Sequence, residues 1–179
     1  PRALPAGWEA SNVASDAKAE IVDFLRKDFA DSALWGVKDP RICRLLPLWQ
    51  PALTEIGAEP VYIVMQRHPL EVVRSLHQRD GLSNGRGLLL WLRHVLEGEK
   101  ATRGAKRSFI SYDALMADWD ATISKAAGIL GLPFDTSDAD ARKEIESFIR
   151  PGLRHFAFRG AELFAEEKLA LWAGRVFEA

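Results

Sequence analysis

The chain has 179 residues, of which 47% are hydrophobic, and its 24 basic and 25 acidic residues leave a formal net charge of −1. This length predicts one domain with one sizeable core and argues against a two-domain enzyme. The balanced charge gives no electrostatic reason to expect nucleic acid or anionic lipid as a partner, so any anion site has to be local.

Cysteine content and hydropathy narrow the class of protein further. The single cysteine, Cys43, excludes an internal disulfide, and no Cys/His cluster has the spacing of a zinc site. We therefore expect a reducing, cytoplasmic environment. No stretch approaches about 18 consecutive apolar residues, so no transmembrane segment is predicted. The chain begins at Pro1 without an initiator methionine or a signal-peptide pattern, so we expect a fragment.

The N-terminal part of the chain predicts a helix followed by a strand. Ser15 precedes apolar residues at helical spacing, which predicts a helix over about 16–30. Residues 34–37 are apolar and lie between polar residues. They predict a short buried strand that ends at Lys38.

A proline-containing helix and a second strand follow. The segment 41–57 is expected to be a helix that kinks or restarts at Pro47 or Pro51 and ends at Gly57, which suits a C-terminal cap. The run VYIVM, residues 61–65, is apolar without alternation. It predicts a strand covered on both faces, as in a parallel sheet.

The remaining sequence continues the alternation of strands and helices. Pro69 suits the first position of a helix, and SFIS at 108–111 predicts a third strand. Further helices are expected at about 86–103, 113–130, 137–149 and 162–177. This order predicts a single α/β domain over residues 1–179, with a mostly parallel sheet flanked by helices.

Basic residues stand where a ligand site is expected. Ligands of open α/β sheets bind beyond the carboxyl ends of the strands, where helix N-termini also point. Lys38 and Arg67 both come at predicted strand ends. Ser75 and Arg79, four residues apart, share one face of the helix that begins at Pro69. An arginine fork, a hydroxyl donor and a second cation together suit a phosphate group.

Spacing alone leaves ordinary alternatives open. Arg79 can pair with Asp80 or Glu71, and Ser75 can be a small residue on a solvated helix face. Arg41 can help to hold a nucleotide or balance charge at the start of its helix. None of the four histidines is singled out as a catalytic base.

Several segments together resemble a known family. RHPLEVVRSLHQR resembles the 3′-phosphate-binding segment of sulfotransferases that use 3′-phosphoadenylyl sulfate (PAPS). WGVKDPR is similar to the Lys-Asp-Pro segment of tyrosylprotein sulfotransferases, and FISYDALMADW is similar to their strand-Tyr-(Asp/Glu)-x-Leu segment. The order of these motifs, which span about residues 33–132, is similar to that in bacterial sulfotransferase-family proteins.

The resemblance implies a sulfotransferase fold related to P-loop NTPases. It implies transfer of a sulfuryl group from PAPS to a hydroxyl of a glycan, lipid or small molecule, with adenosine 3′,5′-bisphosphate as product and no metal ion. Lys38 is the implied catalytic residue, because its counterpart approaches the transferring group. The implied nucleotide-binding residues are Arg67, Ser75, Arg79, Tyr112 and, from a late basic loop, Arg154 and His155.

One departure from the family pattern concerns the other half of the nucleotide site. The family begins with a strand, an Arg-Ser-Gly-Thr-like loop for the 5′-phosphosulfate, and a helix. Neither that loop nor a GxxxxGK[ST] loop occurs in the sequence, so we expect the N-terminal strand and phosphate loop to be missing. A non-catalytic nucleotide- or partner-binding domain of the same fold is the alternative. A nucleotide kinase is disfavoured because Walker-type glycines are absent.

Overall fold

The computed structural model describes residues 3–134, 137–149 and 168–178. Strands β1 (Tyr62–Gln66) and β2 (Arg107–Ser111) pair in parallel. The helical elements are η1 (Trp8–Ala10), α1 (Asn12–Phe29), α2 (Ile42–Glu55), α3 (Pro69–Asp80), α4 (Asn84–Ala101), α5 (Tyr112–Ala117), α6 (Trp119–Leu130), α7 (Ala139–Phe148) and α8 (Lys168–Glu178). The described fold is thus mixed α/β and mostly helical, and its two parallel strands confirm the predicted strand direction.

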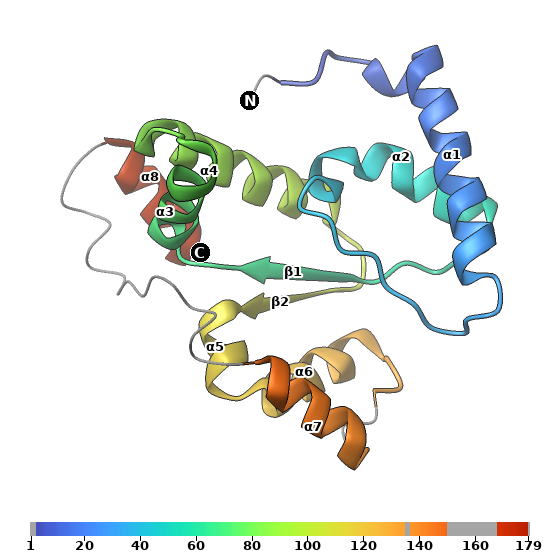
Figure 1. Cartoon of the computed structure of the whole chain (residues 1–179). Coiled ribbons are helices and arrows are strands. Elements are labelled where there is room, and N and C mark those ends of the chain that lie inside the picture. The colour runs from blue at the N-terminus through green and yellow to red at the C-terminus, as the bar shows by residue number, and fades with distance from the viewer. Residues whose placement is uncertain (1–2, 135–136, 150–167, 179) are drawn as a thin grey trace.

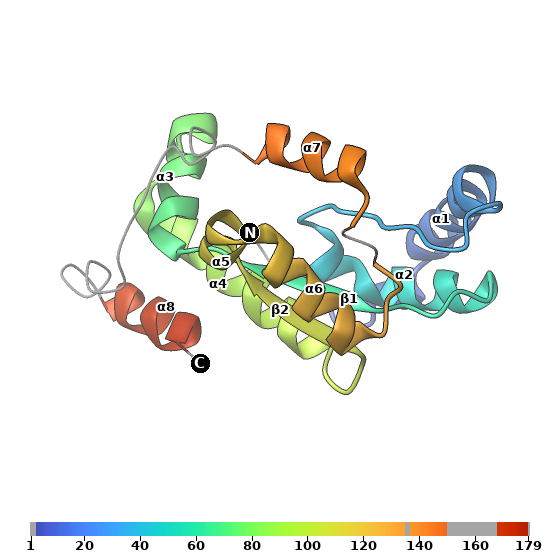
Figure 2. The same cartoon turned by 90° about the horizontal axis from the view of Figure 1, so that it is seen from below.

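Helices cover the strand pair from two sides. Helix α4 packs against β1, and α6 packs against β2 from the opposite side, as Figures 1 and 2 show. Helix α2 packs on α4 and α1 packs on α2, near the end where β1 begins (Figure 1). The carboxyl ends of both strands point away from α1.

A compact apolar cluster joins α3, α4 and α8. Its buried members are Val73, Leu88, Trp91 and Ala173. Helices α3 and α4 approach closely at Gly87, where an added Cβ atom would lie 3.2 Å from Cγ2 of Val73. This packing holds the start of α3 against α4, directly after the end of β1.

Local capping explains where two helices begin and end. Helix α1 begins at Asn12, earlier than predicted, because the Ser11 hydroxyl accepts a hydrogen bond from the Ala14 amide at 3.2 Å. Helix α2 runs through both of its prolines as one helix, without the predicted restart. Its predicted end is confirmed, because Gly57 has φ 72° and the Ala58 amide donates to the Leu53 carbonyl at 2.9 Å.

The prediction of a strand at 34–37 is wrong. These residues form no strand, and the side chains of Leu34 and Val37 are exposed. A strand needs a hydrogen-bonded neighbour, and the described sheet contains β1 and β2 alone. Lys38 therefore does not follow a strand.

The covering of β1 also differs from the prediction. Ile63 and Met65 are exposed, whereas the residues that alternate with them are partly buried. Helix α4 packs on β1, while α6 packs mainly on β2. The apolar run VYIVM is therefore covered on one face rather than on both.

The predicted helix at 113–130 is divided into α5 and α6. Asp118 separates them with φ −154° and ψ 90°, which are extended backbone angles. Its carboxylate accepts a hydrogen bond from the Ala121 amide at 2.9 Å and so caps α6. The apolar pattern of the sequence continues across Asp118. The helix is interrupted there because Asp118 caps the start of α6.

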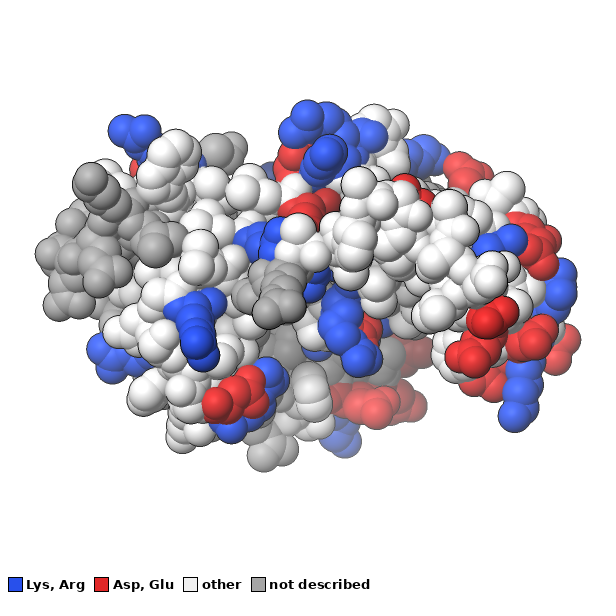
Figure 3. All heavy atoms as spheres, turned by 90° about the horizontal axis from the view of Figure 1, so that it is seen from above, with Lys and Arg blue, Asp and Glu red and all other residues white. Residues whose placement is uncertain are grey.

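The charge distribution agrees with the composition. On the face drawn in Figure 3, basic and acidic side chains form separate small groups between broad uncharged areas, and neither sign covers the whole face. No helix in the described ranges is both long enough and apolar enough to cross a membrane.

Helix α8 confirms the later part of the helix predicted at 162–177, whereas Arg154 and His155 lie outside the described residues.

Candidate functional site

The parallel register brings two predicted site residues together. Gln66 is the register partner of Ser111, so Arg67 and Tyr112 both follow at the carboxyl ends of their strands. The Arg67 guanidinium carbon lies 4.7 Å from the centroid of the Tyr112 ring. A guanidinium over an aromatic face is attracted by the ring's quadrupole. The two residues therefore form one unit, at the sheet edge where α/β proteins bind ligands.

A buried carboxylate holds the same guanidinium. Nε of Arg67 donates to Oε2 of Glu71 at 2.9 Å, and the Glu71 side chain is 0% exposed. Burial of a carboxylate is costly unless a cation or hydrogen-bond donors compensate the charge. The Arg67 side chain, which is 30% exposed, supplies that compensation from the surface side.

The main chain at Arg67 is anchored as well. Its carbonyl accepts a hydrogen bond from Nε1 of Trp91 at 3.2 Å, and Trp91 belongs to the buried cluster. The next residue, His68, is buried, and its ring meets Phe177 edge-on with centroids 5.3 Å apart. The turn from β1 into α3 is thus held by packing from α4 and α8.

Arg67 keeps part of its hydrogen-bonding capacity. Its described contacts are the Nε bond to Glu71 and the stacking on Tyr112. Its terminal nitrogens donate no hydrogen bond to any residue that the structure describes. A guanidinium that is held at Nε and along one face can offer those nitrogens to a planar or tetrahedral oxyanion.

The two other predicted residues on α3 lie apart from this unit. Arg79 pairs with Asp80, with Nη2 and Oδ2 2.7 Å apart, which confirms the alternative that spacing left open. This ion pair raises the pKa of Arg79 and lowers the pKa of Asp80. Ser75 is exposed, and neither Ser75 nor Arg79 has a polar contact with Arg67.

The segment around Lys38 is exposed and locally paired. Lys38 is exposed, and its charge contributes to lowering the pKa of the neighbouring Asp39. Arg41 binds Asp39 through both side-chain oxygens, with Nε to Oδ1 at 2.9 Å and Nη2 to Oδ2 at 2.6 Å. Arg41 therefore balances a neighbouring carboxylate.

The Arg41 pair gives a testable pH effect. Hydrogen bonds from the Arg41 side chain and backbone lower the pKa of Asp39 from 3.8 to about 2. Its stabilising contribution is present above the ordinary pKa and is lost as the pH falls through about 2. We expect carboxyl NMR titration to show this low value, and Arg41→Gln to return it toward 3.8. A value near 3.8 in the unaltered chain would contradict the pairing.

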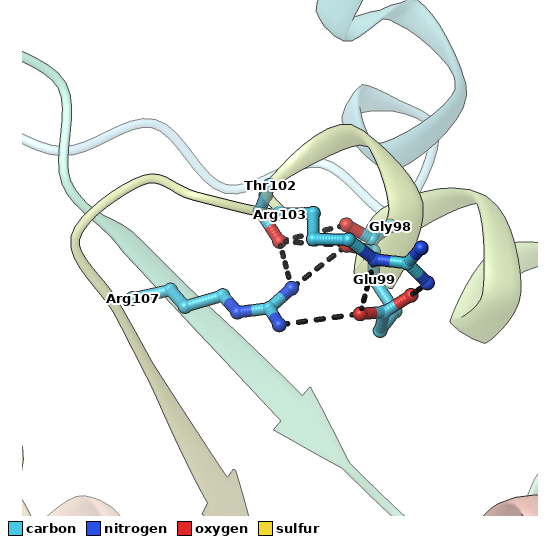
Figure 4. Close-up of polar contacts among 5 residues, drawn as sticks. All are labelled: Gly98, Glu99, Thr102, Arg103 and Arg107. Carbon is cyan, nitrogen blue, oxygen red and sulfur yellow. Dashed lines mark hydrogen bonds and ion pairs between the residues drawn. The ribbon is translucent and has the colours of Figure 1, made fainter.

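Two arginines near the end of α4, Arg103 and Arg107, donate hydrogen bonds from their terminal nitrogens to protein acceptors. At the end of α4, Nη1 of Arg107 donates to the Glu99 carbonyl at 2.7 Å and to Oγ1 of Thr102 at 3.1 Å (Figure 4). Nη2 of Arg107 and the guanidinium of Arg103 both bind the Glu99 carboxylate. These terminal nitrogens are used by protein acceptors, so this cluster braces the connection from α4 to β2.

Two contributors to the site escaped prediction from the sequence. Glu71 was considered only as an alternative partner of Arg79, and Arg67 precedes α3, so helical spacing gave no signal for their pair. Trp91 was not singled out in the sequence as a site residue. Its hydrogen bond to Arg67 joins residues 24 positions apart, so no local pattern reveals it.

The described residues suggest no other ligand site of comparable definition. A depression of about 170 Å³ beside α1 is lined by Lys18, Arg26 and Glu55, and these charges pair with one another. No group of three or more His, Cys, Asp or Glu side chains in the described ranges could hold a metal ion.

No protein-family model, curated protein or solved structure matches this chain.

Proposed function

We propose that this chain is a PAPS-dependent sulfotransferase domain with a P-loop-like sulfotransferase fold, and that it binds the 3′-phosphate of the nucleotide at Arg67. The observation that supports the proposal is the guanidinium held between Glu71 and Tyr112, with its terminal nitrogens directed to no described protein acceptor. This unit lies where the parallel strands end, which is the usual ligand position in α/β folds.

The residues at this corner fit a phosphate group. Arg67 supplies a charged hydrogen-bonding fork, and the start of α3 contributes the positive end of a helix dipole. Ser75 is exposed on α3 and can donate its hydroxyl. Tyr112 stacks on Arg67 and borders the nucleotide. Arg79 joins them if its pair with Asp80 opens when the nucleotide binds.

Sulfuryl transfer assigns a separate task to Lys38. An acceptor hydroxyl oxygen forms a bond to sulfur, and the bond from sulfur to the bridging phosphate oxygen breaks. The hydroxyl proton passes to a base, and adenosine 3′,5′-bisphosphate leaves. A lysine ammonium can neutralise charge that develops on the sulfuryl and bridging oxygens. Lys38 is exposed, so its ammonium group is accessible to a bound ligand.

A non-catalytic nucleotide-binding domain is the second candidate. The observation that favours it is the position of Lys38, which follows no strand. The two candidates share the phosphate site and differ in turnover. Transfer of labelled sulfuryl groups from PAPS to a panel of hydroxyl compounds, abolished by Lys38→Ala, would establish the enzyme. Tight nucleotide binding without any transfer would favour the second candidate.

Calorimetric titration tests the phosphate site directly. We expect the chain to bind adenosine 3′,5′-bisphosphate more tightly than ADP, because only the former carries a 3′-phosphate. Arg67→Ala should weaken bisphosphate binding roughly 10- to 100-fold, the effect of losing charge-assisted hydrogen bonds. It should change ADP binding far less.

Arg103→Ala is the matched control for this titration. Arg103 is also an arginine in a pair with glutamate four residues away, but it lies at the other end of the strands. Its replacement should leave both affinities unchanged. Equal losses of bisphosphate and ADP binding in Arg67→Ala, or no preference in the unaltered chain, would contradict the proposed role of Arg67.

A further inference from the structure

We infer that Glu71 is a positioning residue: its buried carboxylate holds the Arg67 guanidinium so that the terminal nitrogens face the 3′-phosphate before the nucleotide arrives. The inference rests on the proposed function and adds a residue that does not itself touch the ligand. Its basis is the combination of burial, hydrogen bonding and stacking at one arginine.

Two contacts restrict the Arg67 side chain, and a third fixes its main chain. Glu71 binds Nε, the Tyr112 ring lies against the guanidinium, and Trp91 holds the main-chain carbonyl. An exposed arginine without such contacts samples many rotamers and loses that freedom on binding. Holding the side chain in advance reduces this cost and so strengthens binding. The carboxylate at Nε also leaves the terminal nitrogens as the donors that remain for a ligand.

The environment of Glu71 distinguishes it from an ordinary acidic residue in a first helical turn. Such residues are usually solvated and interact with the helix dipole. The glutamates in the comparable pairs of α4, Glu97 with Arg93 and Glu99 with Arg103, are 34% and 30% exposed. Glu71 is 0% exposed. Its carboxylate is therefore presented to Arg67 from inside the fold, and solvent does not compete for it.

A simple truncation of Glu71 would mix two effects of opposite sign. Removal of the carboxylate releases Arg67, which weakens phosphate binding, and it also removes a negative charge that repels the phosphate. Comparison of Glu71→Gln with Glu71→Leu separates them. Both variants are neutral and similar in size, but only the glutamine can still accept a hydrogen bond from Nε of Arg67.

The experiment measures nucleotide affinity of the two variants by calorimetry. We expect adenosine 3′,5′-bisphosphate to bind Glu71→Gln roughly 3- to 10-fold more tightly than Glu71→Leu, the range expected for holding one long side chain in place. Adenosine 5′-monophosphate, which lacks the 3′-phosphate, should bind both variants equally. Equal bisphosphate affinities, or an equal change for both nucleotides, would overturn the inference.

The unaltered chain provides a second measurement that does not depend on folding of the variants. The Nε–H of Arg67 should give a resolved, slowly exchanging NMR signal without nucleotide, because it is already bonded to Glu71. A signal that appears only after nucleotide is added would overturn the positioning role alone. Failure of the unaltered chain to prefer the bisphosphate would instead overturn the proposed function, and with it this inference.

Discussion

Replacement of Arg67 by leucine should lower the free energy of unfolding by about 3 kcal/mol, the loss typical when one partner of a buried ion pair is removed. Glu71 is 0% exposed, so its carboxylate would remain inside the fold after losing the ion pair with Nε of Arg67. Leucine retains the apolar part of the arginine side chain, which limits the loss from packing. Chemical denaturation monitored by circular dichroism would measure the change.

Two further variants identify the cause of that loss. In Arg103→Leu, the partner Glu99 is partly exposed and still binds Arg107, so the loss should stay below about 1 kcal/mol. In the double variant Arg67→Leu with Glu71→Leu, no charge is buried, so most of the lost stability should return. If Arg67→Leu were as stable as Arg103→Leu, the stability of the fold would not depend on the ion pair between Arg67 and Glu71.

The predicted stability loss affects how binding to Arg67 variants is interpreted. Arg67 neutralises a buried carboxylate from one side and offers its terminal nitrogens to solvent on the other. A variant could therefore lose affinity because the turn into α3 loosens, without any direct role in phosphate binding. The comparison with ADP resolves this, because loosening weakens both nucleotides, whereas loss of a phosphate contact weakens only the bisphosphate.

Local signals in the sequence predicted the elements that carry the site. The runs VYIVM and SFIS are rich in branched and aromatic residues and end in residues that favour turns or helix starts, which identified β1 and β2. Pro69 marked the first residue of α3. The family resemblance named Arg67 and Tyr112 as site residues, and the parallel pairing of β1 with β2 places them next to each other.

Local sequence signals failed where an element depends on a neighbouring strand or helix. Residues 34–37 are as apolar as SFIS, yet they form no strand, because a strand is defined by the chain that pairs with it. The composition of a segment does not show which strand, if any, will pair with it. The exposure of Ile63 and Met65 has a similar origin, since cover for the second face of β1 has to come from elsewhere. The position of Lys38 was mispredicted for this reason.

The sequence predicted the polar contacts of the site only in part. Arg67 precedes α3, so helical spacing does not predict its pair with Glu71, whereas it permits a pair of Glu71 with Ser75 on the same helix face. Burial decides between them, because a carboxylate inside the fold requires compensation of its charge. Burial at Glu71 depends on the packing of α3 on α4, which joins residues far apart in the chain.

Trp91→Ala should lower the free energy of unfolding by about 4 kcal/mol, the typical loss for removing a buried aromatic side chain. Trp91 is 6% exposed and packs in the cluster that joins α3, α4 and α8. Trp172 provides a matched control in α8, because it is 64% exposed and its truncation removes little buried surface. Thermal or chemical denaturation of Trp172→Ala should show a change below about 1 kcal/mol.

Trp91→Phe separates the hydrogen bond of the indole from its packing. Phenylalanine keeps most of the apolar contact but cannot donate to the Arg67 carbonyl, which Nε1 now reaches at 3.2 Å. We expect a loss of about 1 kcal/mol in stability beyond the packing change. The preference for adenosine 3′,5′-bisphosphate over ADP should also fall, because the main chain that carries Arg67 is less restrained. Unchanged preference in a folded Trp91→Phe variant would mean that Glu71 and Tyr112 alone hold the guanidinium in place.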